Sequence, residues 1–208
     1  MGKKFNEDKN KTYESKEHSL HKKKIVKNQD YTKFRFFIGT FDNQTPKFHL
    51  ILNDLYDSNE KDELELRIMS PVGLVIECQQ VVNIMNNKFN GRTTAYIESH
   101  ASSAGAIVFA NADKRVIYEN SRIMFHNYSG GYGGKFQDIK DRLDFDEKHI
   151  ISFLSVAKQF LNKKEWKQMV NGKNFWFDAS DMLKRNIATH IIVDGKEMTK
   201  KEYKKYKK

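Results

Sequence analysis

Three short segments of the chain carry residue types that could together perform acyl transfer. The run Ala101–Ala106 (ASSAGA) places Ser103 among very small residues, between a predicted strand and a predicted helix. A serine at such a turn is exposed, and the free N–H groups of a helix N-terminus can stabilise a developing oxyanion. Taken alone, a run of small residues equally suits tight helix packing. Other segments of the chain are needed to distinguish an active-site serine from a packing residue.

A histidine and a glycine could complete this chemistry. His126 follows a short apolar strand candidate, and the end of a strand can present an imidazole as a general base. Gly73 follows Pro71 and Val72 after another predicted strand, where its N–H can act as a second oxyanion donor. A structural histidine and a plain turn are the alternatives for these two residues, and only their order along the chain with Ser103 favours a serine-type site.

The elements that must position these residues alternate between strand and helix. Apolar alternation and β-branched or aromatic runs predict six strands, at Lys33–Gly39, Leu64–Met69, Thr93–Glu98, Val116–Tyr118, Ile123–Phe125 and His190–Val193. Apolar steps of three and four predict helices at Asn43–Tyr56, Leu74–Phe89, Ile107–Ala110, Phe136–Leu161, Lys163–Val170 and Ala179–Arg185. Such alternation indicates an α/β domain with largely parallel strand pairing.

The charge is confined to the two ends of the chain. The net charge is +10, and residues 1–33 and 196–208 carry +5 each, which leaves residues 34–195 neutral. This distribution predicts a neutral domain over 34–195, a basic polar extension over 1–33 and a solvated Lys-rich tail over 196–208. It argues against nucleic acid as a partner, because a nucleic-acid-reading domain carries its basic stripe on the folded face. Tethering of the tails to nucleic acid or to an acidic protein is the alternative.

Length and composition exclude several other classes. With 208 residues the chain suits one domain with a substantial core, and its single Cys78 cannot form an internal disulfide, which fits the cytoplasm. The longest charge-free stretch in the apolar middle has 14 residues, Ser99–Ala112, against the ~20 that a membrane span needs. No secretory leader, nucleotide-binding loop or metal-ligand spacing is evident, so we expect no membrane, metal or cofactor.

Four motifs in order resemble those of the ClpP family, the proteolytic subunits of the ATP-dependent Clp protease. They are Ser70–Gly73 (SPVG), Ala101–Ala106, Asn120–His126 (NSRIMFH) and Gly130-Gly131-Tyr132, and the resemblance runs from about Phe34 to Val193. It implies a ClpP/crotonase-like spiral of β-β-α units, and a subunit that assembles into stacked rings and cleaves unfolded polypeptides. It also implies an AAA+ unfoldase partner, which alone would use ATP.

The resemblance assigns roles residue by residue. Ser103 falls on the family's nucleophile, and His126 falls on its general base. Gly73 and Ala104 fall on the positions whose N–H groups form the oxyanion hole. Ser102 lies one residue off the nucleophile position, and His100 is too close to Ser103 along the chain to be the first choice of base. The segment Gly130–Gly134 and the long helix Phe136–Leu161 resemble the handle through which two rings stack.

Two departures from the family pattern stand out. Val72 replaces a glycine beside Gly73, and a β-branched residue avoids positive φ, so the local geometry can differ. The family's catalytic aspartate falls on Asn174, which can orient a histidine but cannot stabilise imidazolium by charge. Asp178 is an alternative carboxylate, although it also suits the N-cap of the helix that follows.

The sequence leaves alternative functions open. Asn174 favours a weakly active or non-catalytic ring subunit that mixes with an active paralogue, while retention of both Ser103 and His126 argues against it. A specialised protease on the same fold, for instance one that processes viral precursors, is a third possibility. The Lys- and Asn-rich composition and the N-terminal extension fit a divergent or phage-encoded member of the family.

Overall fold

One twisted sheet organises the protein. The computed structural model describes residues 12–14, 23–27, 31–39, 46–71 and 73–207, and in this part of the chain ten strands form the sheet. Eight of them lie in the order β1 (Thr12–Glu14), β2 (Lys23–Lys27), β3 (Thr32–Ile38), β4 (Glu63–Ser70), β5 (Thr93–Ser102), β6 (Lys114–Tyr118), β9 (His190–Val193) and β10 (Lys196–Thr199). The strands β7 (Arg122–Phe125) and β8 (Phe175–Asp178) branch from this order, since β7 pairs with β5 and β8 with β7.

The centre of the sheet is parallel, as the sequence predicts. The pairs from β3 through β4, β5 and β6 to β9 are all parallel, while the outer pairs β1–β2, β2–β3 and β9–β10 are antiparallel. The strand β5 extends past the predicted end at Glu98 to Ser102. Its first half pairs with β6 and its second half with β7. This extension carries the chain to the turn at Ser103.

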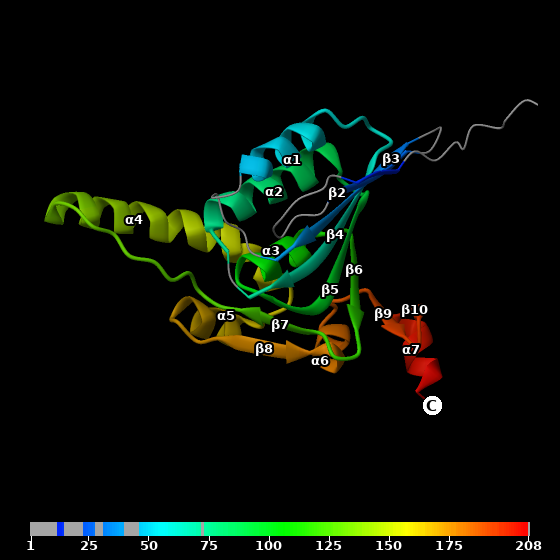
Figure 1. Ribbon diagram of the computed structural model, residues 1–208. Coiled ribbons are helices and arrows are strands. Elements are labelled where there is room, and N and C mark those ends of the chain that lie inside the picture. Colours follow the sequence, from blue (N-terminus) through cyan, green and yellow to red (C-terminus); the bar gives the residue numbers. More distant parts are fainter. Residues whose placement is uncertain (1–11, 15–22, 28–30, 40–45, 72, 208) are drawn as a thin grey trace, which may run out of the picture.

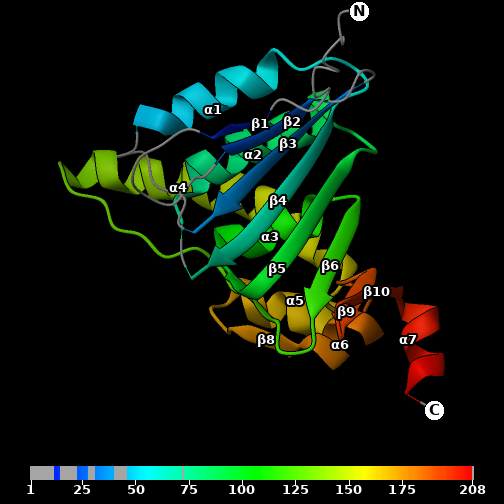
Figure 2. The same cartoon turned by 45° about the vertical axis from the view of Figure 1, so that its right-hand side comes forward.

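Three helices cover one face of the sheet. They are α1 (Pro46–Tyr56), α2 (Val75–Lys88) and α3 (Ala104–Asn111) (Figure 2). The side chains of Phe36, Ile68 and Ile97 point from β3, β4 and β5 into the core, where Phe89 and Phe109 are fully buried. Because α3 is apolar all round, it lies inside the molecule, between the sheet and its neighbours.

The helix-free face of the sheet is held by an ion-pair network. Glu65 on β4 accepts hydrogen bonds from Arg35 and Arg67, and Arg67 also donates to Glu98 and stacks on the Tyr96 ring. Burial acts to raise the pKa of Glu65, but the two guanidinium groups outweigh it and hold the pKa below its usual range. The charged side chains on this face are therefore paired with one another in ion pairs.

The long helix predicted over Phe136–Leu161 is shorter than expected. The helix α4 spans Phe136–Phe153 and projects beyond the body (Figure 1). A 3₁₀ turn, η1 (Leu154–Gln159), then bends the chain so that Leu154 and Ala157 pack into the core against α3. The apolar residues keep a spacing of three and four through η1, because an α-helix and a 3₁₀-helix both place residues at this spacing on roughly the same face.

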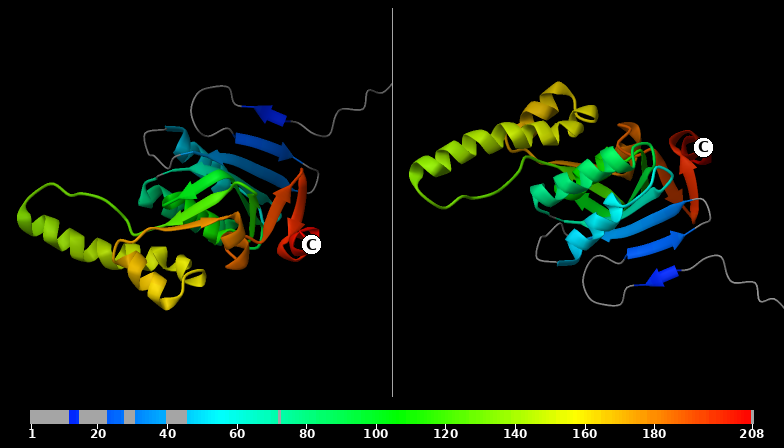
Figure 3. Two further views of the ribbon diagram at one scale, coloured as in Figure 1. Left: turned by 90° about the horizontal axis from the view of Figure 1, so that it is seen from below. Right: turned by 90° about the horizontal axis from the view of Figure 1, so that it is seen from above.

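Both ends of the chain contribute to the fold. At the N-terminus, β1 and β2 lie in the predicted extension and add to the sheet beside β3. At the C-terminus, β10 and the helix α7 (Lys200–Tyr206) stand where the sequence predicts a solvated Lys-rich tail without regular structure (Figure 3). A two-residue turn with positive φ at Asp194 and Gly195 joins β9 to β10, and a capping box between Thr199 and Glu202 starts α7.

Two further helices complete the lower part of the molecule. The helix α5 (Lys163–Val170) starts at an Asn162 capping box, and α6 (Ala179–Lys184) starts directly after β8. Both agree with the helices predicted from sequence, whereas β8 is absent from the predicted strands.

Close packing of α3 on β4 predicts the effect of one substitution. A Cβ atom on Gly105 would lie 2.7 Å from Ser70 Cβ, a distance that requires one element to move. We expect Gly105→Ala to lower the free energy of unfolding by about 1–3 kcal/mol, measured by denaturant titration. The control Gly133→Ala, where a Cβ meets nothing within 4 Å, should change stability by less than about 0.5 kcal/mol. Equal stability of the two variants would contradict the close approach.

Candidate active site

Ser103 lies in the turn between β5 and α3 with an uncommon backbone conformation. Its φ is 55° and its ψ is −122°, a region that non-glycine residues rarely adopt. The Ser103 N–H donates to Met124 O on β7, and its carbonyl accepts the N–H groups of Ala106 and Ile107. Although Ser103 is the N-cap of α3, its hydroxyl makes no capping bond. The hydroxyl is therefore not used to cap α3, and the backbone conformation matches that of a strained strand-to-helix elbow.

The sequence predicts Ala104 and Gly73 as the two donors to an oxyanion. Ala104 is the first residue of α3, and the first N–H groups of a helix have no acceptor within it. Gly73 lies half-buried just before α2 begins at Val75. Val72, the β-branched neighbour of Gly73, lies outside the described residues. Ala104 thus stands in the first turn of α3, where the helix dipole favours negative charge, whereas Gly73 precedes Leu74, the N-cap of α2, and lies outside that helix.

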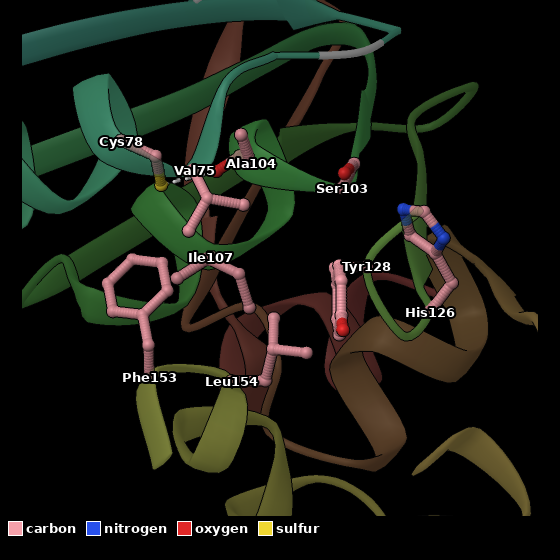
Figure 4. Close-up of a pocket in the computed structure, with 9 residues that line it drawn as sticks. All are labelled: Val75, Cys78, Ser103, Ala104, Ile107, His126, Tyr128, Phe153 and Leu154. Carbon is pink, nitrogen blue, oxygen red and sulfur yellow. Dashed lines mark hydrogen bonds between the residues drawn. The ribbon is translucent and has the colours of Figure 1, made fainter. Parts of the chain in front are cut away.

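A small apolar cavity adjoins the Ser103 turn. It is lined by residues from α2, α3, the segment after β7, and the junction of α4 with η1, as Figure 4 shows: Val75, Cys78, Ser103, Ala104, Ile107, His126, Tyr128, Phe153 and Leu154. Cys78 Sγ donates to Ala104 O over 3.3 Å, which ties α2 to α3. Burial raises the pKa of the Cys78 thiol, so this sulfur stays protonated and does not compete as a nucleophile.

His126 is the first residue after β7, and its ring faces Ser103 at the mouth of the cavity (Figure 4). Its Nε2 atom is buried and has no hydrogen-bond partner among the described residues. Burial lowers the pKa of His126 below the ordinary value, so the imidazole is neutral at pH 7 and able to accept a proton. In substrate-free enzymes such catalytic hydrogen bonds are often open, and they close when substrate binds.

The pairing of β7 with β8 separates the two candidates for the third residue. The register pairs Arg122 with Asp178 and Phe125 with Phe175, so the next residues along each strand are His126 and Asn174. Asp178 lies at the opposite end of β8, four residues away, which is about 13 Å along a strand. Its carboxylate accepts the N–H of Asp181 at 2.8 Å and caps α6. By this register Asn174 and His126 are the residues that follow the last ladder pair, whereas Asp178 lies at the far end of β8.

The other residues weighed from sequence lie away from the cavity. Ser102 is only 2% exposed and pairs with Met124 on β7, while His100 pairs with Arg122 further back along β5. Neither lines the cavity. The sequence analysis missed Tyr128, Phe153 and Leu154 as lining residues. The sequence shows that these residues are apolar or aromatic. It does not show that they line one cavity, because that depends on how α4 and η1 pack against the rest of the molecule.

No group of three His, Cys, Asp or Glu side chains is arranged to hold a metal ion among the described residues. None of the helices in the same part of the chain is long and apolar enough to cross a bilayer.

Comparison with known proteins agrees with the motifs on which the site is built. Residues 32–194 match the Clp protease family. The chain is also similar to the ATP-dependent Clp protease proteolytic subunit 2 of Tropheryma whipplei (strain Twist), with 27% identity over 136 residues. That alignment covers 63% of this chain and 74% of the relative. The family match extends from the first residue of β3 past the end of β9, so it includes every site residue described above.

The strained turn at Ser103 predicts that two small substitutions differ in their effect on stability. Ser103→Gly removes the Cβ that disfavours positive φ, whereas Ser103→Ala keeps it. We expect Ser103→Gly to be more stable to denaturant than Ser103→Ala by about 1–3 kcal/mol, although glycine ordinarily destabilises folded chains. Both variants should lose any Ser103-dependent chemistry. A less stable glycine variant would show that the turn carries no strain.

Proposed function

The chain belongs to the Clp protease family, and we propose that it is a serine endopeptidase subunit that cleaves unfolded polypeptides. The observation that carries the proposal is the meeting of the Ser103 turn and the neutral His126 imidazole at one cavity. A strained serine alone or a buried histidine alone would be a structural feature. Together, at the start of an apolar helix and beside a pocket, they supply a nucleophile, a base and oxyanion donors.

The chemistry proceeds in two steps with the residues of this site. Ser103 Oγ attacks the scissile carbonyl carbon while His126 takes the hydroxyl proton, and the carbonyl oxygen becomes an oxyanion. The N–H groups of Gly73 and Ala104 donate to that oxygen. The C–N bond then breaks as His126 gives its proton to the leaving amine. Water, deprotonated by His126, attacks the ester carbonyl and releases the second peptide and Ser103.

Asn174 sets the expected rate of this chemistry. If its side-chain oxygen accepts from the Nδ1–H of His126, the ring keeps the tautomer whose Nε2 can take the Ser103 proton. An amide lacks the negative charge that stabilises imidazolium, and in a serine protease an Asp-to-Asn change lowers kcat about 10⁴-fold through the wrong tautomer. The chain is therefore a slow peptidase compared with one that carries a carboxylate at this position.

The outer half of α4 supports assembly of several copies. Phe136, Leu143 and Ile150 lie on one face of the helix, and this face is buried at Ile150. Further out, where α4 leaves the body, Leu143 is 42% exposed and Phe136 is 82% exposed. A second copy of the chain would cover this surface if rings stack through α4. Inside such a ring, only unfolded chains could reach the active site. An ATP-dependent unfoldase in the cytoplasm would deliver them.

A second candidate function is a structural ring subunit without peptidase activity. Two observations favour it: Nε2 of His126 has no partner among the described residues, and an amide stands where the family has a carboxylate. The same fold and the same α4 surface would then serve an assembly whose active copies are a paralogue. Reactivity of Ser103 separates the two functions.

Labelling with a fluorophosphonate tests the peptidase proposal directly. We expect the wild-type protein to be labelled at Ser103, with the site mapped by peptide mass spectrometry. His126→Ala should slow labelling at least about 10²-fold, because the hydroxyl loses its base. Asn174→Asp should speed labelling about 10-fold or more, because a carboxylate stabilises imidazolium. An assembled protein in which neither the wild type nor Asn174→Asp is labelled would be a structural subunit.

Sedimentation tests the role of α4 in assembly. Replacing Phe136 and Leu143 together by serine should shift the assembly towards half its mass, because the apolar contact between two rings is lost. Asp138→Ser, which changes an exposed residue on the opposite face of the same helix, should sediment like the wild type. If the double variant keeps the wild-type mass, or if the wild type is a monomer, α4 does not join two rings.

A further inference from the structure

The side chain of Asn127 links the segment that carries His126 to the end of α5. Its Nδ2 donates to Val170 O over 2.7 Å, and its Oδ1 accepts the N–H of Tyr128 over 2.9 Å. Val170 is the last residue of α5, so its carbonyl has no donor within the helix and is open to an outside one. One amide thus satisfies two backbone groups that lie 42 residues apart.

The end of α5 is closed by a hydrogen-bonded turn, and Asn174 comes just after that turn. Gly172 adopts φ 97°, its N–H donates to Met169 O, and the Lys173 N–H donates to Gln168 O. These two bonds with a left-handed glycine form a Schellman motif, which fixes the direction in which the chain leaves a helix. Asn174 is the second residue after Gly172. Any group that holds the last turn of α5 therefore also sets the position of Asn174.

Sheet pairing stops just short of the site. The β7–β8 ladder ends at the pair Phe125 and Phe175, and His126 and Asn174 are the next residues, outside both strands. Ladder hydrogen bonds consequently do not fix how far apart these two side chains lie. Among the described residues, the Asn127 bond to Val170 O joins the two segments immediately beyond the last pair.

We propose that Asn127 is a positioning residue that sets the distance between His126 and Asn174. This inference rests on the proposed serine peptidase chemistry and deepens it. Asn127 does not reach substrate or the reacting atoms in this role. It closes the open end of the β7–β8 pair, so that the amide of Asn174 stays within reach of the imidazole.

An amide is required for this role because both of its ends are used. The carboxylate of an Asn127→Asp variant would accept from the Tyr128 N–H but could not donate to Val170 O, and the methyl group of Asn127→Ala would do neither. The bond to Tyr128 also matters, because Tyr128 lines the cavity beside Ser103. Asn127 thereby braces the two residues after His126 as well as the turn that precedes β8.

A double-mutant cycle between Asn127 and Asn174 tests the inference. The variants are Asn127→Asp, Asn174→Ala and the double variant, with Asn171→Ala as a control that removes another amide at the end of α5. Hydrolysis of a short peptide ester should show kcat lowered about 10-fold by Asn127→Asp with KM changed less than about 2-fold. In the Asn174→Ala background the same substitution should change kcat less than about 2-fold, because there is no amide left to position. Asn171→Ala should keep wild-type kcat.

A second measurement reads the same coupling without turnover. The pKa and tautomer of His126, followed by NMR in the assembled protein, should change equally in Asn127→Ala, which adds no charge beside the imidazole, in Asn174→Ala and in the double variant of these two. Separate, additive changes in kcat or in the His126 pKa would overturn the positioning role while leaving the peptidase proposal intact. Absence of turnover and of Ser103 labelling in the wild type would defeat the peptidase proposal instead, and the NMR cycle would still decide how Asn127 acts.

Discussion

The backbone at Ser103 is the constraint on which the site depends. A chain that leaves β5 and enters α3 within one residue must adopt the positive φ observed there, and such a conformation costs about 1–3 kcal/mol for a residue with a Cβ. The surrounding structure holds it from both sides. β5 is paired to β4 and β7, while α3 is fixed by the contact of Gly105 with Ser70 and by the Cys78 bond to Ala104 O. Strain at the turn is thus maintained by core packing rather than by the residue itself.

The strand β7 then brings the remaining residues to that turn. Its pairing with β5 places Met124 opposite Ser102, and the Ser103 N–H continues this contact to Met124 O. Its pairing with β8 on the other side directs Asn174 towards the residue after Phe125. The proposed nucleophile, base and third residue therefore flank three neighbouring strands, β5, β7 and β8, and strand register brings their segments to the same end of these strands. Beyond the last ladder pair, side-chain hydrogen bonds such as that of Asn127 to Val170 O hold the two segments together.

Much of this arrangement could be predicted from the sequence, and the reasons are local. Hydrophobic periodicity placed β9 and α5 at their observed bounds, and it found α2 within one residue at each end. The elements that were missed had signals of another kind. The dipeptide Asp194-Gly195 marks a two-residue hairpin, and Thr199 with Glu202 marks a capping box, yet the lysines around them suggested a solvated tail. Likewise β8 is short, and its exposed Trp176 breaks the alternation that a strand of longer length would show.

The site itself could be predicted only in part. Small residues at 101–106 and the order of the motifs predicted Ser103 and His126, because those depend on residue type and position in the chain. The choice between Asn174 and Asp178 required the β7–β8 register, since four residues in sequence become about 13 Å in space. The role of Asn127 required a hydrogen bond between segments 43 residues apart. Contacts of this kind leave no periodic trace in a sequence.

A crystal structure of the protein after reaction with a fluorophosphonate tests the central claim most directly. The account predicts that phosphorus is bonded to Ser103 Oγ. A phosphoryl oxygen should lie at an ordinary hydrogen-bond distance, about 2.7–3.2 Å, from the backbone nitrogens of Ala104 and Gly73. The His126 ring should face the adduct, with Asn174 on the far side of the ring. An unmodified Ser103, or an adduct from which His126 and both N–H groups point away, would contradict it.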